Sequence, residues 1–469
     1  MSNINSINAE ISVISPIDND VYITRPFASL THITTSLKKA KQAQTQWQAT
    51  PLAERKTLCS KAIDWLVTNK HQLAEEITWM MGRPIQYSQG EIAGLEERAR
   101  HMIAISDDAL ATIELPEKPH FTRYIKRVPL GTVFVVAPWN YPYLTAINSI
   151  IPALLSGNSV VLKHSVQTPL CAERLFQAFT EAGLPEGVFQ YLHLTHQDTD
   201  HVISSGCINH VAFTGSVKGG KAIEQFAAGH LISVGLELGG KDPAYVRSDA
   251  NLQDAVDTII DGAFFNSGQS CCSIERVYVH SSIYDAFIEK AVLLINQYQL
   301  GRSDNLNTTL GPLVNGKAAD FVREQTQEAI QQGAKPHIDE HHFTNSQTGS
   351  AYLAPQLLTN VNHTMRIMTE ETFGPTLGIQ KVESDQEAII LMNDSDFGLS
   401  ACIFTQDIDK GIHLGDQLET GTFFINRCDY LDPALAWAGI KQSGRGCTLS
   451  SIGFEQLTRP KSYHVKYLI

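Results

Sequence analysis

Short apolar runs alternate with amphipathic segments along the first half of the chain. Residues 37–80 place Leu58, Ala62 and Leu66 at helical spacing, which predicts a helical lead-in. From Thr132 onward, strand-like runs cover 133–136, 159–162, 188–191, 210–213 and 231–234, and helical segments lie near 143–155, 169–182 and 217–228. Continuous apolar strands separated by helices are typical of a parallel sheet buried on both faces. This half is therefore predicted to be an α/β, doubly wound nucleotide-binding sheet.

The helix at 169–182 carries clear end signals. Thr168 can cap it, Pro169 suits its first turn and Gly183 ends it. We expect Leu175, Phe176 and Phe179 to face inward.

A second βα series begins after Gly240, with strand candidates at 276–279 and 421–425. It predicts a second α/β domain, the catalytic one. Two further segments, 120–128 and 462–469, also look strand-forming, with Tyr463, Val465, Tyr467 and Ile469 alternating. They either form an arm that pairs with another chain or pair with each other within one subunit.

The predicted domain bounds follow from these patterns. The dinucleotide-binding domain takes 1–110 and 130–238, the catalytic domain 239–442, and a small β oligomerisation arm 111–129 and 443–469.

Charge and composition exclude several classes of function. Acidic residues outnumber basic ones, 49 to 36, for a net charge of −13, and no basic stripe would track a phosphate backbone. Nucleic acid is therefore not an expected partner. The first twenty residues lack a secretory leader pattern and no run of 18 apolar residues occurs, so a cytoplasmic protein without a membrane span is expected.

No metal site is expected. The eight cysteines show no zinc-site spacing and should be reduced thiols. The cluster of His337, Asp339, Glu340, His341 and His342 could in principle hold a metal, but a solvated loop is the favoured interpretation.

Three residues carry the candidate chemistry. Glu237 begins the motif Glu-Leu-Gly-Gly-Lys, Cys271 follows Gly-Gln-Ser, and Asn140 lies in Pro-Trp-Asn-Tyr-Pro. A thiolate that attacks a carbonyl carbon leaves negative charge on oxygen, which an amide N–H can hold, and a carboxylate can then activate water. Taken singly, Cys271 could be a packing thiol and Glu237 a loop acid. Together they predict covalent aldehyde chemistry.

In content and order these motifs resemble the aldehyde dehydrogenase superfamily, from about Trp47 to the C-terminus. The resemblance implies oxidation of an aldehyde to an acid with NAD or NADP, in homodimers or homotetramers. It selects Cys271 over Cys272 as the nucleophile that forms a thiohemiacetal and then a thioester. Asn140 and the Cys271 N–H would hold the oxyanion, and Glu237 would activate the hydrolytic water, which disfavours the CoA-acylating branch.

The expected cofactor site lacks the Gly-x-Gly-x-x-Gly loop. Instead Gly215 permits a tight turn before a helix whose N-terminus can hold a pyrophosphate. The resemblance assigns cofactor contacts to Trp139, Lys163, Gly215, Ser216, Gly220, Glu371 and Phe373. Val166 stands where NAD-preferring members commonly have a glutamate that repels a 2′-phosphate, so we predict that NADP is accepted.

The predicted substrate pocket contains Tyr141, Asn148, Phe265, Ser270, Cys272 and Trp437. Succinate-semialdehyde dehydrogenases place carboxylate-binding arginines at the positions of Asn148 and Phe265, so that substrate is disfavoured. Tyr141 and Trp437 resemble the aromatic lining of amino- and betaine-aldehyde dehydrogenases, but Asn148 replaces an aromatic residue of that lining. An uncharged aliphatic or aromatic aldehyde is favoured, and an amino- or betaine-aldehyde is the alternative. Succinate semialdehyde, or a non-catalytic structural relative, is less favoured.

Overall fold

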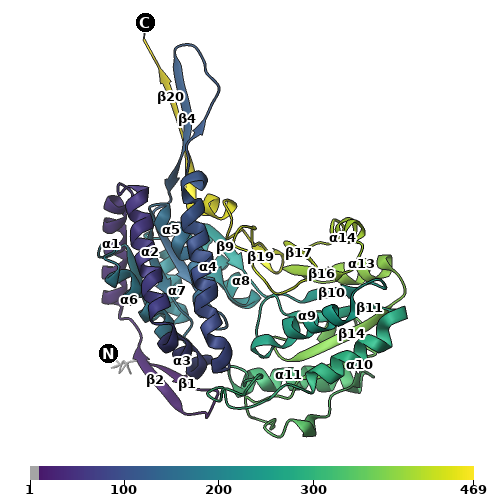
Figure 1. Cartoon of the computed structure of the whole chain (residues 1–469). Helices are drawn as coiled ribbons and strands as arrows, with labels where there is room; N and C mark the ends of the chain where they lie inside the picture. The colour runs from purple at the N-terminus through teal and green to yellow at the C-terminus, as the bar shows by residue number, and fades with distance from the viewer. Residues whose placement is uncertain (1–9, 469) are drawn as a thin grey trace.

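The computed structural model describes residues 10–468, and its two large sheets lie side by side (Figure 1). The six-stranded sheet has the order β19-β9-β8-β5-β6-β7 and is parallel except for β19. Its strands are β5 (Thr132–Val136), β6 (Ser159–Lys163), β7 (Phe189–Tyr191), β8 (His210–Thr214), β9 (Ser233–Glu237) and β19 (Gly444–Arg445). The predicted strands are confirmed, except that β9 begins two residues later than expected. Leu231 has a φ of 52°, which an extended strand cannot contain.

Helices cover both faces of this sheet. In β5, Val133 and Val135 pack into one apolar cluster, whereas Phe134 and Val136 pack into another on the opposite face. The sheet is therefore doubly wound, as predicted. The helices of this half are α1 (Leu30–Trp47), α2 (Leu52–Thr68), α3 (Lys70–Met81), α4 (Ile85–Ala109), α5 (Pro142–Leu155), α6 (Pro169–Glu181), α7 (His196–Ser204) and α8 (Val217–Ala227).

Two details predicted for α6 were wrong. The Thr168 side chain does not cap the helix, because its hydroxyl bonds to His164 Nδ1. Phe176 is 37% exposed and packs edge-on against Tyr191, while Leu175 and Phe179 are buried. Adjacent residues of a helix point about 100° apart, so Leu175 and Phe176 cannot both face one core.

The seven-stranded sheet, of order β12-β13-β14-β11-β10-β16-β17, forms the second half of the fold. Its strands are β10 (Asp242–Val246), β11 (Ile274–His280), β12 (Lys335–Pro336), β13 (Gln356–Thr359), β14 (Thr376–Val382), β16 (Ser400–Phe404) and β17 (Thr422–Ile425). Its larger helices are α9 (Leu252–Phe264), α10 (Tyr284–Ile295), α11 (Gly316–Gln331), α13 (Asp385–Asn393) and α14 (Ile408–Gly415). The predicted strands at 276–279 and 421–425 correspond to β11 and β17.

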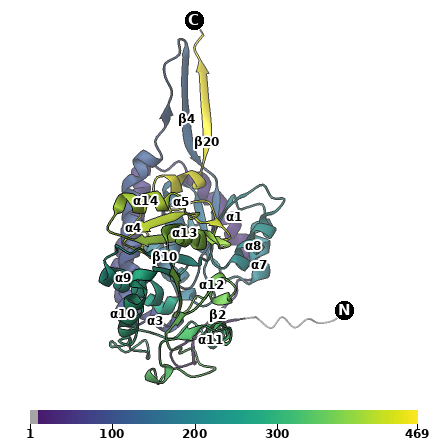
Figure 2. The same ribbon diagram turned by 90° about the vertical axis from the view of Figure 1, so that its right-hand side faces the viewer.

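A narrow ribbon projects from the body beside α5 (Figures 1 and 2). It consists of β20 (Thr458–Lys466), β4 (Phe121–Pro129) and β3 (Ile113–Glu114). Strand β20 pairs antiparallel with β4 along its whole length, so the two predicted strand segments pair within one chain. Ile469, part of the predicted alternation, lies outside the described residues.

A two-stranded hairpin at the other end of the molecule was not predicted. It consists of β1 (Glu10–Ile14) and β2 (Val21–Pro26). Tyr352 donates a hydrogen bond to the Ile17 carbonyl, which ties the hairpin turn to the second half of the fold.

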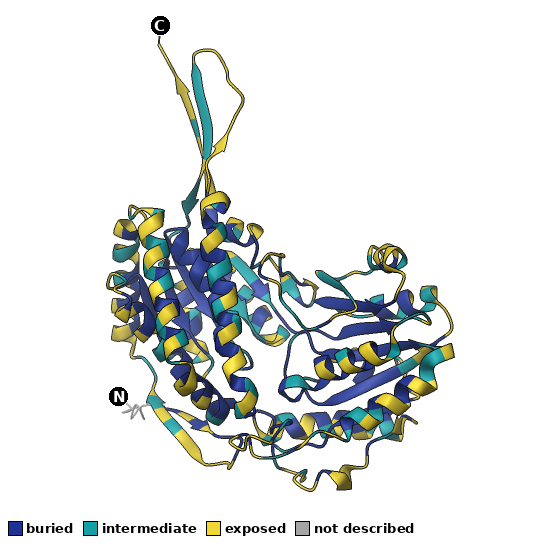
Figure 3. Cartoon of the chain, viewed as in Figure 1, coloured by how far each residue is buried: buried dark blue, intermediate teal, exposed yellow. Residues whose placement is uncertain are grey.

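Buried residues concentrate in the strands of both sheets and on the helix faces that cover them (Figure 3). Within residues 10–468, no helix combines the length and apolar character needed to cross a membrane. The segment 337–342 is largely exposed, and no group of three His, Cys, Asp or Glu in the described part of the chain is arranged to hold a metal ion.

Candidate active site

A tight turn after α9 presents Cys271. Asn266, Ser267 and Gly268 all have positive φ angles, and the turn is held by buried hydrogen bonds. Ser267 Oγ donates to the Gly311 carbonyl at 2.8 Å, and the Gln269 side chain accepts from the Val314 N–H at 2.8 Å. The half-buried Cys271 therefore sits on a rigid loop, where it lines a cavity of about 340 Å³.

Asn140 is held against the same loop. Its side-chain amide donates to the Gln269 carbonyl at 3.1 Å, and its own backbone carbonyl accepts from the Arg83 guanidinium. Arg83 is itself buried and pairs with Glu91 at 2.6 Å. Glu91 also accepts the Tyr143 N–H at the start of α5 at 2.9 Å. A buried ion pair thus fixes the position of Asn140 relative to Cys271.

Glu237 ends β9 and lies outside the larger cavity. Its carboxylate lines a separate space of about 20 Å³ together with Thr214 and Thr448. Both hydroxyls donate to it, Thr214 at 2.9 Å and Thr448 by a shorter bond. Burial raises the pKa of Glu237, and the two hydroxyls oppose that shift. The Glu237 carboxylate is therefore aligned by two hydroxyl donors.

Lys163 ends β6 at the carboxyl edge of the six-stranded sheet. The residue is 9% exposed, and its ammonium has no hydrogen-bond or ion-pair partner among residues 10–468. Burial lowers the pKa of Lys163 to about 8. An unpartnered buried ammonium at this edge suits a ligand with phosphate or ribose oxygens. Val166, three residues on, is 46% exposed and adds no negative charge there.

The turn before α8 is shaped by close packing. Ser216 is the N-cap of α8 and accepts the Gly219 N–H at 3.2 Å. Gly215 does not have a positive φ angle, so the tight turn does not explain this glycine. A side chain at Gly215 would come within 2.8 Å of the Phe213 ring, and one at Gly220 within 2.6 Å of Leu238. The N-terminus of α8 lies in a closely packed turn with free backbone N–H groups, which suits a dinucleotide phosphate.

The remaining predicted cofactor residues lie between the two sheets. Trp139 packs edge-on against Phe373, with ring centroids 5.7 Å apart. Glu371 accepts the Gly240 N–H at 3.1 Å, and burial raises its pKa to about 8. An enclosed acceptor beside two aromatic rings fits a nicotinamide ribose.

Four of the six predicted pocket residues line the 340 Å³ cavity, namely Tyr141, Phe265, Ser270 and Cys272. Asn148 and Trp437 do not. Asn148 is buried behind the cavity wall, and Trp437 is 4% exposed in the apolar core, where its backbone pairs with Thr448. One face of the Tyr141 ring is covered by the Arg83 guanidinium, 4.5 Å from the ring centroid.

None of the four charged residues that line the cavity, Glu97, Arg98, Asp261 and Asp429, was predicted from the sequence, and the charged groups of Arg98 and Asp429 are buried. Arg98 enters from α4, on the buried face that it shares with Glu91, Leu95 and Met102. The helical spacing of these positions could have revealed Arg98 in the sequence, because a charged residue is unusual on the apolar face of a helix. Asp429 had no such signal, because it lies in an irregular loop. It accepts from Cys272 Sγ at 2.9 Å and Ser270 Oγ at 3.1 Å, and burial raises its pKa to about 7.

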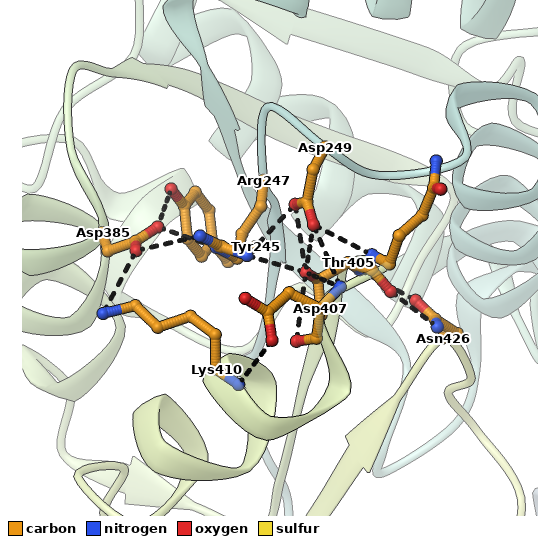
Figure 4. Close-up of polar contacts among 9 residues, drawn as sticks. Tyr245, Arg247, Asp249, Asp385, Thr405, Asp407, Lys410 and Asn426 are labelled. Atoms are coloured by element: carbon orange, nitrogen blue, oxygen red, sulfur yellow. Dashed lines mark hydrogen bonds and ion pairs between the residues drawn. The ribbon is translucent and has the colours of Figure 1, made fainter.

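The loop that carries Asp429 is anchored by a polar network at the end of β10 (Figure 4). Asn426 makes two hydrogen bonds of 2.9 Å with the Thr405 backbone. The Thr405 hydroxyl donates to Asp249, which also accepts the Asp407 N–H at 3.0 Å and pairs with Arg247. The network holds the start of the cavity-lining loop in place.

Comparison with known proteins agrees with this geometry. Residues 4–463 match the profile of the aldehyde dehydrogenase family. The chain is similar to succinate-semialdehyde dehydrogenase (NADP+) of Deinococcus radiodurans, with 31% identity over 96% of this chain and 94% of that protein. It is also similar to betaine aldehyde dehydrogenase of Bacillus subtilis, with 30% identity over 96% and 93% of the two chains.

Solved structures show the same fold. Succinic semialdehyde dehydrogenase from Streptococcus pyogenes, in complex with NADP+, matches with a TM-score of 0.93 and 28% identity over 97% of this chain and all (100%) of that one. The chain therefore belongs to the aldehyde dehydrogenase family and is an NAD(P)-dependent oxidoreductase that acts on aldehydes.

Proposed function

We propose that Cys271 is the nucleophile, that Asn140 holds the oxyanion and that Glu237 is the base of this reaction. The Cys271 thiolate forms a bond to the aldehyde carbon, and the carbonyl electron pair moves to oxygen near the Asn140 amide. A bound nicotinamide would accept the hydride. The carbonyl re-forms as a thioester, and Glu237 takes a proton from the water that cleaves it, which releases the acid and the thiolate.

The observation that carries this proposal is the contact between Asn140 and the Cys271 loop. The Asn140 amide nitrogen lies 3.1 Å from the carbonyl of Gln269, two residues before Cys271. The amide is therefore held at the base of the loop that presents the thiol.

For the cofactor, we propose that Lys163, Ser216, Gly215 and Gly220 hold the adenosine and phosphate side, and that Trp139, Glu371 and Phe373 hold the nicotinamide side. The unpartnered Lys163 ammonium and the uncharged Val166 support acceptance of NADP in addition to NAD.

The cavity provides less support for a cationic substrate. Trp437 does not line it, and the Tyr141 ring face is covered by Arg83. Tyr141, Phe265 and Tyr430 do line the cavity, so an amino- or betaine-aldehyde would find only part of the expected aromatic lining. An anionic aldehyde is more compatible with the cavity than the sequence implied. Positions 148 and 265 carry no arginine, but Arg98 reaches the cavity from α4.

We further propose that the domains have the bounds predicted from the sequence. The ribbon would act as the oligomerisation arm and pair with a second copy of the chain in a homodimer or homotetramer. In the described chain β20 is at an edge of its sheet, which leaves one side of that strand for another strand. A monomer in light scattering would contradict this.

The eight free thiols suit a reducing compartment such as the cytoplasm.

The proposed chemistry is tested by trapping the acyl-enzyme. The protein is mixed with an aldehyde and NADP, quenched, and analysed by peptide mass spectrometry, with reduced-nicotinamide absorbance followed in parallel. We expect an acyl adduct on Cys271, longer-lived in Glu237→Gln. No adduct and no absorbance change with any aldehyde would instead favour a non-catalytic relative.

A further inference from the structure

Arg98 is a buried cation without a carboxylate partner. Its residue is 9% exposed, and only Nη1 donates hydrogen bonds, to the Leu144 carbonyl at 3.2 Å and to Asn148 Oδ1 at 3.4 Å. Nε and Nη2 donate to no residue in the 10–468 range, and no carboxylate of that range lies within ion-pair distance.

The other deeply buried arginines are satisfied. Arg83 pairs with Glu91 at 2.6 Å, and Arg276 donates to the carbonyls of Lys241, Leu391 and Met392. Arg98 differs from both because it lines the cavity that contains Cys271.

An uncompensated guanidinium is costly to bury. A buried charge loses its hydration, and without a partner in the protein that loss is not compensated. Burial lowers the pKa of Arg98, and the charges of Glu91 and Glu237 offset that effect without touching the guanidinium. An arginine nevertheless keeps its proton in proteins. The unused donors therefore provide a fixed positive site on the cavity wall.

We propose that the substrate is an aldehyde with an anionic group at its far end, and that Arg98 binds that group. The group is a small oxyanion, such as a carboxylate, that can accept from Nε and Nη2 in the forked geometry of a guanidinium. The inference rests on the proposed function, because it assumes that the aldehyde carbon lies at Cys271. It replaces the uncharged aldehyde favoured by the sequence.

The size and other charges of the cavity define this substrate further. A volume of about 340 Å³ is at the low end for ligand pockets, so a short chain fits best. Asp429 also lines the cavity, but burial raises its pKa to about 7, so near neutral pH a large share of it is uncharged. Glu97 is exposed, and water screens its charge from the interior. Asp261 is also exposed along part of its side chain, and burial of the rest raises its pKa.

The test compares aldehydes of equal length that differ only in their far end. Butanal, succinate semialdehyde and 4-aminobutanal are assayed with the wild-type protein, Arg98→Gln and Arg98→Lys. Arg100→Gln is the matched control, because Arg100 lies on the same helix but pairs with Asp64 and Glu96 at the surface. Sulfonate and phosphate analogues of the semialdehyde then identify the type of oxyanion.

We expect the wild-type protein to prefer the semialdehyde over butanal in kcat/KM. Arg98→Gln should lower that value for the semialdehyde by about tenfold to a hundredfold, mainly through KM, because a charged hydrogen bond is lost. Butanal turnover should stay within about twofold, and Arg98→Lys should recover part of the loss. Succinate should inhibit the wild-type protein competitively against butanal and should not inhibit Arg98→Gln.

Other outcomes overturn the inference. Equal loss with butanal and semialdehyde in Arg98→Gln would mean that Arg98 acts on Cys271 or Glu237. A preference for 4-aminobutanal would mean that the carboxylates dominate the cavity. These outcomes differ from a failure of the proposed function itself. In that case no aldehyde would be turned over and no adduct would form on Cys271.

Discussion

The Thr214 hydroxyl donates a hydrogen bond of 2.9 Å to the carboxylate of Glu237. The two residues end the neighbouring parallel strands β8 and β9, where they are paired in register. The other carboxylate oxygen accepts from Thr448, which lies far along the chain. Glu237 is thus fixed from both sides by hydroxyls, next to the turn that carries Gly215 and Ser216, the proposed cofactor contacts.

Removing either hydroxyl should change the pH dependence of thioester hydrolysis. Burial already raises the pKa of Glu237, and the hydroxyls lower it, so Thr448→Val should raise it further. Because the base works only when deprotonated, activity falls as pH drops through this pKa. The acid limb should move to higher pH, with about a tenfold rate loss on that limb per pKa unit. Thr448→Ser should behave as wild type, and an unmoved acid limb in Thr448→Val would contradict the role of the hydroxyl.

The two adjacent thiols should differ sharply on substitution. Cys271→Ala should abolish turnover and the acyl adduct, because no other thiol occupies its position on the rigid loop. Cys272→Ala should keep most activity, since its Sγ is engaged with Asp429. Steady-state rates and adduct mapping decide this, and an adduct on Cys272 in the wild-type protein would reverse the assignment.

The affinity for NADP should fall above about pH 8. Lys163 has a lowered pKa of about 8, so its ammonium loses charge, and hence attraction for a 2′-phosphate, as pH rises through that value. The KM for NADP should rise by up to about tenfold per pH unit, while the KM for NAD changes less. Val166→Glu should shift kcat/KM toward NAD by repelling the phosphate. If the ratio of the KM for NADP to the KM for NAD did not change with pH in the wild-type protein, Lys163 would not contact the 2′-phosphate.

Breaking the buried pair of Arg83 and Glu91 should damage stability and catalysis together. Glu91→Gln removes the carboxylate that pairs with Arg83, a residue that is only 2% exposed. The unpaired buried charge should lower the free energy of unfolding by about 3–5 kcal/mol. The activity of the folded fraction should also fall, because Arg83 holds the carbonyl of Asn140. Denaturant unfolding and kcat measure the two effects. Glu96→Gln at a surface pair should change stability by less than about 1 kcal/mol.

Asp429→Asn should stabilise the protein increasingly as pH rises from about 3.8 to about 7. The pKa of Asp429 is raised from 3.8 to about 7, so the folded state binds this proton more tightly than the unfolded state. Between about pH 3.8 and pH 7 the unfolded state loses this proton while the folded state keeps it, so stability falls as pH rises through that window and does not change further above it. The asparagine removes the cost while it keeps an acceptor for Ser270. We expect a Tm gain of roughly 2 °C or more at about pH 8, a smaller gain at about pH 5 and little gain at about pH 3.5, and an equal gain at all three would contradict a titrating Asp429.

Local patterns accounted for much of the fold. The strands and helices between 132 and 228 were predictable, because each apolar run or amphipathic stretch must be buried in its own way. The errors occurred where neighbours override local preference. Phe176 faces outward because Leu175 takes the core side, and Leu231 adopts a left-handed turn in place of the first position of a strand.

By itself, the sequence determined the class of reaction, because the short motifs around Asn140, Glu237 and Cys271 resemble those of the aldehyde dehydrogenase family, to which the chain belongs. The substrate cavity was decided by the tertiary structure alone. Arg98, Cys271 and Asp429 come from α4, a turn after α9 and an irregular loop, and only packing of the two halves brings them to one space. Trp437, by the same packing, is turned into the core. The charge that a ligand meets depends on distances between segments remote in sequence, and no local pattern encodes those distances.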